Sequence, residues 1–155
     1  PLVTAFNTYY GGKKIHRKLE TPHGVLTQTW RFSEEACADF EEDHWIGDLE
    51  AQFEAARFMV QDRSYDYDLS EYQRDLAVIG EDGVIMLEIP ENPLKMLHWL
   101  MGPEKAILAT IDSPGKVKEL CEIHTAKTLE FVKEICVRTR YEDTQIARAS
   151  RRERV

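Results

Sequence analysis

The sequence predicts a mixed α/β chain that, as an isolated segment, takes an α+β form with an N-terminal antiparallel hairpin and a mostly helical C-terminal half. Three observations support this fold class. Strand-like runs separated by turn signals fill residues 1–32, apolar residues recur at helical spacing after them, and one continuous apolar run follows at residues 83–89. With 155 residues the chain is long enough for one domain. We expect that domain over residues 1–137 and a compositionally different tail over residues 138–155.

The first elements are predicted to form an antiparallel hairpin or meander. Two turn signals, Gly11-Gly12 and Thr21-Pro22-His23-Gly24, separate three runs that alternate or are β-branched, at residues 2–6, 13–19 and 25–32. The third run has four side chains on one face: Leu26, Gln28, Trp30 and Phe32. We therefore predict that Trp30 lies in the core.

From Ser33 the pattern is helical. Apolar residues recur at helical spacing in two stretches, Leu49, Phe53, Ala56 and Val60, then Leu69, Tyr72, Leu76 and Ile79. Asp68 followed by Glu71 predicts a capped start for the second helix, and Gly80 predicts its end. An acidic set precedes both helices and lacks the glycine turn and alternating spacing of a calcium loop. We interpret this set as a solvated helix face: Glu34, Glu35, Asp39, Glu41, Glu42 and Asp43.

Residues 83–89, GVIMLEI, are typical of a strand covered on both faces, as in a parallel sheet or barrel. Three prolines then predict helix starts, because proline is favoured in the first helical turn: Pro93, Pro103 and Pro114. The helix after Pro114 is the longest and carries one apolar stripe: Val117, Leu120, Cys121, His124, Thr128, Phe131, Val132 and Ile135.

Charge and cysteine content narrow the classes of partner. A net charge of −8 argues against nucleic acid or an anionic membrane as the main partner, since both require clustered Lys and Arg. Three cysteines without a secretory leader, and no apolar run long enough to span a bilayer, predict a soluble cytoplasmic protein without disulfides.

The tail, residues 138–155, differs from the body of the chain. It holds six Arg and three acidic residues, a net charge of +3, which leaves −11 on the preceding residues. Three interpretations stay open: a solvated arm that pairs with the acidic body, a non-native end from a reading-frame shift or cloning junction, and an RNA-binding arm.

Few residues are candidates for chemistry. Cys121 and His124 are three apart on the apolar stripe, a spacing that can bring two ligands to one metal, but as buried stripe residues they are better explained as core. We therefore expect no metal site. His98 is predicted to be either a buried, hydrogen-bonded side chain or a residue facing a cleft beyond the strand at 83–89. Glu88 and Glu91 flank the same strand end and could act there as acid or base, the alternative being exposed loop carboxylates.

The chain resembles a known superfamily over residues 20–137. The resemblance rests on the order and spacing of several segments: Thr21-Pro22-His23-Gly24-Val25-Leu26 ahead of Trp30, residues 45–50, Tyr72 with Ile79-Gly80-Glu81-Asp82-Gly83-Val84, Asn92-Pro93-Leu94, Met101-Gly102-Pro103-Glu104-Lys105-Ala106, Asp112-Ser113-Pro114 and Val117-Lys118-Glu119-Leu120. These are similar to segments of the uroporphyrinogen decarboxylase superfamily, which also contains the cobalamin-dependent methyltransferases.

The resemblance implies a (β/α)₈ barrel of which this chain is a part, with the site at the C-terminal mouth. It also implies either cofactor-free decarboxylation of a porphyrinogen or zinc-dependent methyl transfer from a corrinoid to a thiol. The chain lacks the His-x-Cys zinc motif of the methyltransferases and the N-terminal Arg-rich segment of the decarboxylases, and His98 stands where the decarboxylases have a substrate-facing Tyr.

We therefore expect a truncated member without a complete catalytic site, inactive alone and forming a homo-oligomer. Zinc, a corrinoid protein or a tetrapyrrole would belong to the intact family member, with no cofactor held by this chain. The alternatives are a non-catalytic oligomerising or protein-interaction domain, and a half-barrel that builds a site between subunits.

Overall fold

The structure is a computed structural model that describes residues 5–11, 14–65, 68–80, 82–83 and 85–139. Four strands precede five helices among these residues: β1 (Ala5–Gly11), β2 (Lys14–Thr21), β3 (Gly24–Ser33), β4 (Ala38–Asp43), α1 (Leu49–Asp62), α2 (Leu69–Ile79), α3 (Pro93–Met101), α4 (Pro103–Asp112) and α5 (Pro114–Arg138). The chain divides into two compact units, Pro1–Arg63 with Glu91–Thr125, and Ser64–Pro90 with Ala126–Val155. We describe each unit by itself.

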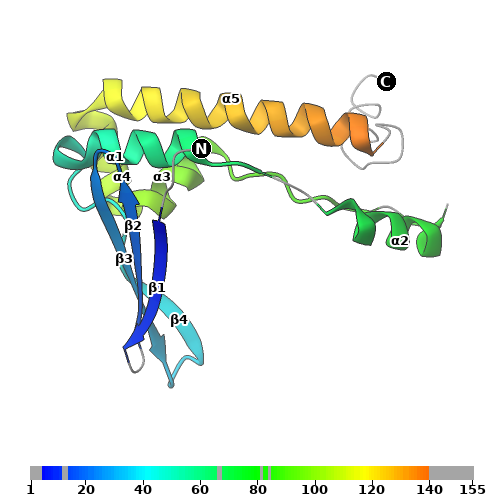
Figure 1. The fold of residues 1–155 in the computed structure, drawn as a ribbon, viewed down its shortest axis with the longest axis horizontal. Helices are drawn as coiled ribbons and strands as arrows, with labels where there is room; N and C mark the ends of the chain where they lie inside the picture. Colours follow the sequence, from blue (N-terminus) through cyan, green and yellow to red (C-terminus); the bar gives the residue numbers. More distant parts are fainter. Residues whose placement is uncertain (1–4, 12–13, 66–67, 81, 84, 140–155) are drawn as a thin grey trace. The chain divides into compact units, whose positions relative to one another are not determined.

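The strands of the first unit form an antiparallel meander in the order β1-β2-β3-β4 (Figure 1). Gly24 closes the β2–β3 turn with φ of 134°, a conformation that favours glycine, and Thr21 Oγ1 donates to its carbonyl at 2.8 Å. The predicted pairing of the second and third runs is confirmed. Residues 2–4 of the first run, and residues 12–13 at the first turn, lie outside the described residues.

The predicted helix from Ser33 onward is wrong for residues 33–43. Ser33 ends β3, a turn follows in which Cys37 has a positive φ of 50°, and β4 pairs antiparallel with β3. The acidic set is therefore a turn and an edge strand. Charged side chains suit that position because they oppose pairing with another chain. The apolar residues that recur at helical spacing begin only at Leu49. Pairing with β3 decides the conformation, because strand formation depends strongly on cross-strand context.

The core of the first unit lies where one end of the sheet meets the helices. Leu19 of β2 and Leu26 of β3 are paired neighbours, and both join a buried cluster with α1, α3 and α5. In Figure 1 the strands extend away from α1, α3 and α4 beyond this point. The prediction for Trp30 is therefore only partly right. It shares the face of Leu26 but is half-buried, with the guanidinium of Arg17 at 5.6 Å from its ring centre.

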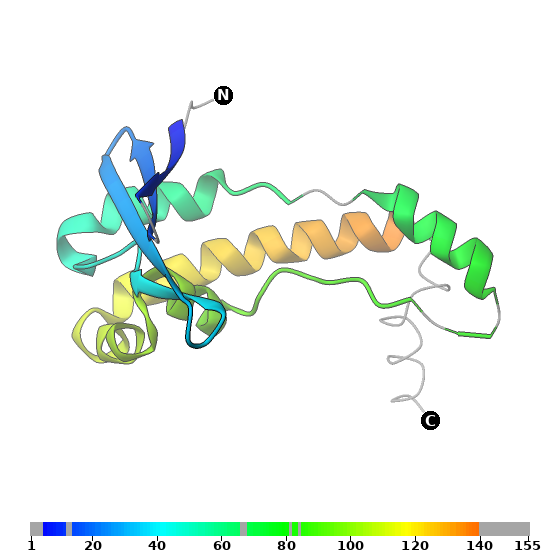
Figure 2. The same cartoon turned by 90° about the horizontal axis from the view of Figure 1, so that it is seen from below.

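The three predicted proline starts are confirmed. Pro93, Pro103 and Pro114 each begin a helix, and Asn92 caps α3 by accepting from the Lys95 amide at 2.9 Å. Figure 2 shows α5 as one uninterrupted helix. Its predicted stripe is confirmed as well, since the residues on it are buried or half-buried while their neighbours are mostly exposed. Among the described residues, no helix is both long and apolar enough to cross a membrane.

The second unit contains α2 and the later turns of α5. Asp68 caps α2 by accepting from the Ser70 amide at 2.8 Å, and Gly80 ends it with φ of 54°, as predicted. The predicted strand at residues 83–89 is not present among the described residues of that segment, where Met86 and Ile89 are exposed. A parallel strand needs a neighbouring strand to hold it, and every strand pairing described is antiparallel and lies in the first unit. The partial barrel therefore stays a prediction.

Candidate functional site

His98, Glu88 and Glu91, the predicted substrate-facing residues, have separate environments. His98 is half-buried in α3, and its carbonyl accepts from the Gly102 amide at 2.8 Å, which ends the helix. Glu91 has an exposed side chain, and its backbone carbonyl accepts a hydrogen bond from His124 Nε2 at 2.5 Å. Glu88 belongs to the second unit and is exposed. Glu91 therefore has a structural role through its backbone, while its carboxylate faces solvent.

His124 and Cys121 lie in surroundings that favour a hydrogen-bonded core histidine and a protonated thiol. His124 is 1% exposed, and its Nε2 must donate to Glu91, because a carbonyl oxygen only accepts. Burial raises the pKa of the Cys121 thiol, and a protonated thiol is a poor metal ligand. In the described part of the chain, no three His, Cys, Asp or Glu side chains gather closely enough to hold a metal ion.

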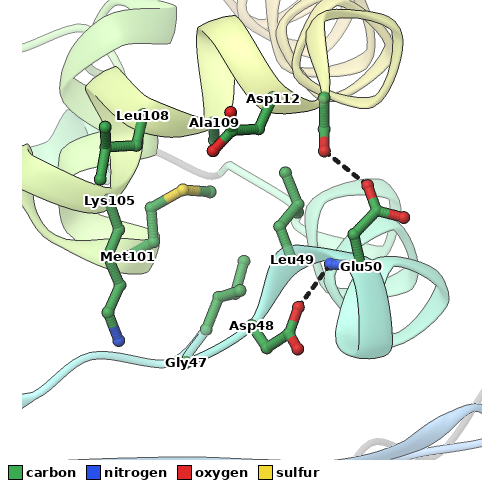
Figure 3. Close-up of a pocket in the computed structure, with 11 residues that line it drawn as sticks. Gly47, Asp48, Leu49, Glu50, Met101, Lys105, Leu108, Ala109 and Asp112 are labelled. Atoms are coloured by element: carbon green, nitrogen blue, oxygen red, sulfur yellow. Dashed lines mark hydrogen bonds between the residues drawn. The ribbon is translucent and has the colours of Figure 1, made fainter.

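A groove of about 340 Å³ lies between α4 and the chain entering α1 (Figure 3). We call it the α4 groove. Its apolar wall comes from Ile46, Leu49, Met101, Leu108 and Ala109, and its polar side chains are Asp48, Glu50, Lys105, Asp112 and Ser113. All of them belong to the first unit. The groove could not be predicted from local sequence patterns, because its two walls are more than 50 residues apart in the chain.

Two of the acidic residues in the α4 groove are already engaged. Asp48 caps α1 by accepting from the amides of Glu50 at 2.9 Å and Ala51 at 3.3 Å. Glu50 accepts from Lys116 Nζ and from Ser113 Oγ, each at 2.5 Å, and these two hydrogen bonds hold the pKa of its carboxyl below the usual range. Of the three carboxylates that line the groove, two therefore have structural roles.

Lys105 and Asp112 are the charged residues of the groove that remain. Neither makes an ion pair with any described residue. In Figure 3 the Lys105 side chain extends away from Asp112, although both arise from α4. The helix thus presents two opposite, unneutralised charges at the rim of an apolar groove.

A second polar cluster connects β3, β4 and the α3–α4 junction. Gln28 is 1% exposed and donates to Glu41 Oε1, which lies 3.0 Å from His44 Nδ1. That separation suits an ion pair, but its alignment is not that of a hydrogen bond. The His44 ring packs against Gly102, where an added Cβ would come within 2.7 Å of it. The cluster therefore helps to set the backbone between α3 and α4.

Sequence reasoning missed this cluster because it assigned residues 33–43 to a helix. One signal could have pointed to it. Gln28 lies between Leu26 and Trp30 on the inward face of its strand, and a polar residue at such a position requires a buried partner.

The outer face of α4 exposes large apolar residues. The helix buries only Ala106 and Ala109, whereas Ile107, Leu108 and Ile111 are 57%, 50% and 72% exposed. An amphipathic helix in a folded protein normally turns its large apolar residues inward. Groups of exposed large apolar residues are common where a protein contacts another protein, a membrane or a ligand.

Comparison with known proteins leaves the resemblance to the uroporphyrinogen decarboxylase superfamily as a proposal. No protein-family model, no curated protein and no solved structure matches this chain.

Proposed function

We propose that this chain is a non-catalytic scaffold that works by protein association, with the outer face of α4 as its contact surface. The observation that carries the proposal is the inverted burial of α4, with alanines inside and Ile107, Leu108 and Ile111 outside. Burying apolar surface contributes roughly 25 cal/mol per Å², so covering three large aliphatic side chains would favour association.

The state of the polar residues supports a scaffold rather than a catalyst. In the α4 groove, Asp48 serves as a helix cap and Glu50 is held by Lys116 and Ser113. His124 is committed to the Glu91 carbonyl. A general acid must be able to donate a proton to the substrate and a general base to accept one, and these groups are engaged in structural hydrogen bonds instead.

The test is sedimentation velocity of the full chain over a wide concentration range. We expect the wild type to sediment above its 18.0 kDa monomer mass and the Ile111→Glu variant to sediment as a monomer. Thr110→Glu is the matched control, because it adds the same charge at an exposed neighbouring position of α4 and should leave association unchanged. Circular dichroism checks that both variants stay folded. A wild type that is monomeric throughout, or equal behaviour of the two variants, would overturn the proposal.

A second proposal concerns ancestry: that the chain is a scaffold segment of the uroporphyrinogen decarboxylase and corrinoid methyltransferase superfamily. It is supported by the three prolines of the resembling segments, Pro93, Pro103 and Pro114, each of which begins a helix. Decarboxylation of a porphyrinogen, or methyl transfer from a corrinoid protein with zinc, would then be the activity of the intact family member.

Two measurements test this second proposal. We expect no turnover when the chain alone is given a porphyrinogen, or a methylated corrinoid protein with a thiol and zinc. Sequencing the coding DNA downstream of the Val137 codon should reveal, in another reading frame, a Gly/Ala/Asp-rich strand followed by a His-x-Cys motif. Downstream DNA without such a remnant counts against the frame-shift account.

A further inference from the structure

We infer that α4 pairs antiparallel with α4 of a second copy of this chain, about a two-fold axis, with reciprocal ion pairs between Lys105 of each copy and Asp112 of the other. This inference rests on the proposed function and deepens it, because it names the occupant of the α4 face.

The apolar stripe of α4 points away from its buried side. Ala106 and Ala109 define the buried side, and at about 100° per residue Ile107, Leu108 and Ile111 fall on the opposite side. Lys105 and Asp112 are seven residues apart, so they lie within about 20° of each other around the helix. Both therefore lie along one flank of the stripe, next to Leu108.

An antiparallel pair brings these two charges together. In such a pair the charged flanks of the two helices lie on the same side of the interface and run in opposite directions. Lys105 of one copy therefore meets Asp112 of the other. The point halfway between Lys105 and Asp112 falls between Leu108 and Ala109, within the apolar stripe. Both ion pairs can therefore form while the stripes are in contact. In a parallel pair, the charged flanks of the two helices would lie on opposite sides of the interface. All four charges would then lack a partner in the other copy.

The helix dipole gives an independent reason. Lys105 lies in the first turn of α4, at the positive end of the dipole, and Asp112 is its last residue, at the negative end. Each charge is thus unfavourable within its own helix, and neither has an ion-pair partner among the described residues. In the antiparallel pair, Lys105 meets the negative end of the second helix and Asp112 meets its positive end. Charge complementarity therefore selects a second copy as the occupant.

The experiment exchanges the charges. Lys105→Asp gives a chain with two acidic flank residues, and Asp112→Lys gives one with two basic flank residues. Both changes improve the match with the helix dipole of the monomer, so we expect both variants to fold. Each alone should self-associate roughly tenfold more weakly than the wild type, because two attractive pairs become repulsive. An equimolar mixture should restore association, and so should the double variant Lys105→Asp/Asp112→Lys.

The outcomes separate this inference from the proposed function. If the mixture associates no better than either variant, while Ile111→Glu still gives monomers, the α4 surface stands and the antiparallel pairing is overturned. If Ile111→Glu also has no effect, the proposed function itself is overturned. Recovery of association in both the mixture and the double variant supports the pairing. Sedimentation velocity of the full chain is the readout in every case.

Discussion

Helices α3 and α4 are consecutive and both rich in apolar residues, yet they use those residues in opposite ways. α3 buries four of its large side chains, namely Met96, Leu97, Leu100 and Met101, whereas α4 buries two alanines and exposes Ile107, Leu108 and Ile111. Apolar content therefore does not tell which helix belongs to the core. What decides is which face meets the rest of the protein.

Gly102 is the point at which the two helices change direction. Its φ of 79° lies in a region that suits glycine, and the His44 ring occupies the space where a side chain would be. The inner side of α4 is lined by the small residues Ala106 and Ala109, so the helix buries little side-chain surface in the core. The large apolar residues of α4 therefore remain exposed.

The largest expected effect contrasts two leucines. Leu100→Ala, in the core, should lower the free energy of unfolding by about 2–5 kcal/mol, because it removes buried contacts and leaves a cavity. Leu108→Ala, on the exposed face of α4, should change it by no more than about 0.5 kcal/mol. Urea denaturation at a concentration where the chain is monomeric measures both. Equal losses would show that α4 is as much a core helix as α3.

The next largest effect on folding stability is expected at Gly102, the junction between α3 and α4. Gly102→Ala should lower the free energy of unfolding by about 1–3 kcal/mol, because a positive φ is strained for alanine and its Cβ would displace the His44 ring. Gly115→Ala, at an open position at the start of α5, is the control and should stabilise by about 0.4–1 kcal/mol. The double variant His44→Ala/Gly102→Ala separates the collision from the backbone strain. A Gly102→Ala variant as stable as Gly115→Ala would rule out a special role for the junction.

A smaller effect is expected at the cap of α3. Asn92→Ala removes the side chain that accepts from the Lys95 amide, and should cost about 1 kcal/mol in urea denaturation. Lys95→Ala keeps that amide and should have little effect. By contrast α4 begins at Gly102 without any side-chain cap, so it depends more on its neighbours than α3 does. Equal stability of Asn92→Ala and Lys95→Ala would show that the Asn92 side chain does not stabilise the start of α3.

The smallest effect is a pH dependence that arises from Glu50 in the first turn of α1. Hydrogen bonds from Lys116 and Ser113 lower the pKa of Glu50, so its contribution is present above the unfolded-state value of about 4.3 and is lost as the pH falls through the lowered folded value. Glu50→Gln should therefore flatten the acid side of the stability curve. Glu130→Gln, at an exposed position of α5, should leave the curve unchanged. Thermal unfolding across this pH range is the measurement.

The sequence by itself determined the features that depend on neighbours along the chain. Paired strand runs gave β2 and β3, Asp68 and Asn92 begin helices because their side chains can accept from nearby amides, and three prolines mark helix starts. The stripe of α5 was predictable because a helix puts residues three and four apart on one side. Each of these needs only local geometry.

Only the tertiary structure decided the rest. Residues 38–43 became β4 because they pair with β3, and Trp30 is only half-buried because the helices cover the other end of the sheet. The candidate site depends on the same kind of information. His98, Glu88 and Glu91 could be selected as residue types, but the α4 groove and the outward stripe of α4 arise from segments distant in sequence. Burial is set by what packs against a face, and the spacing of residues within one helix does not contain that partner.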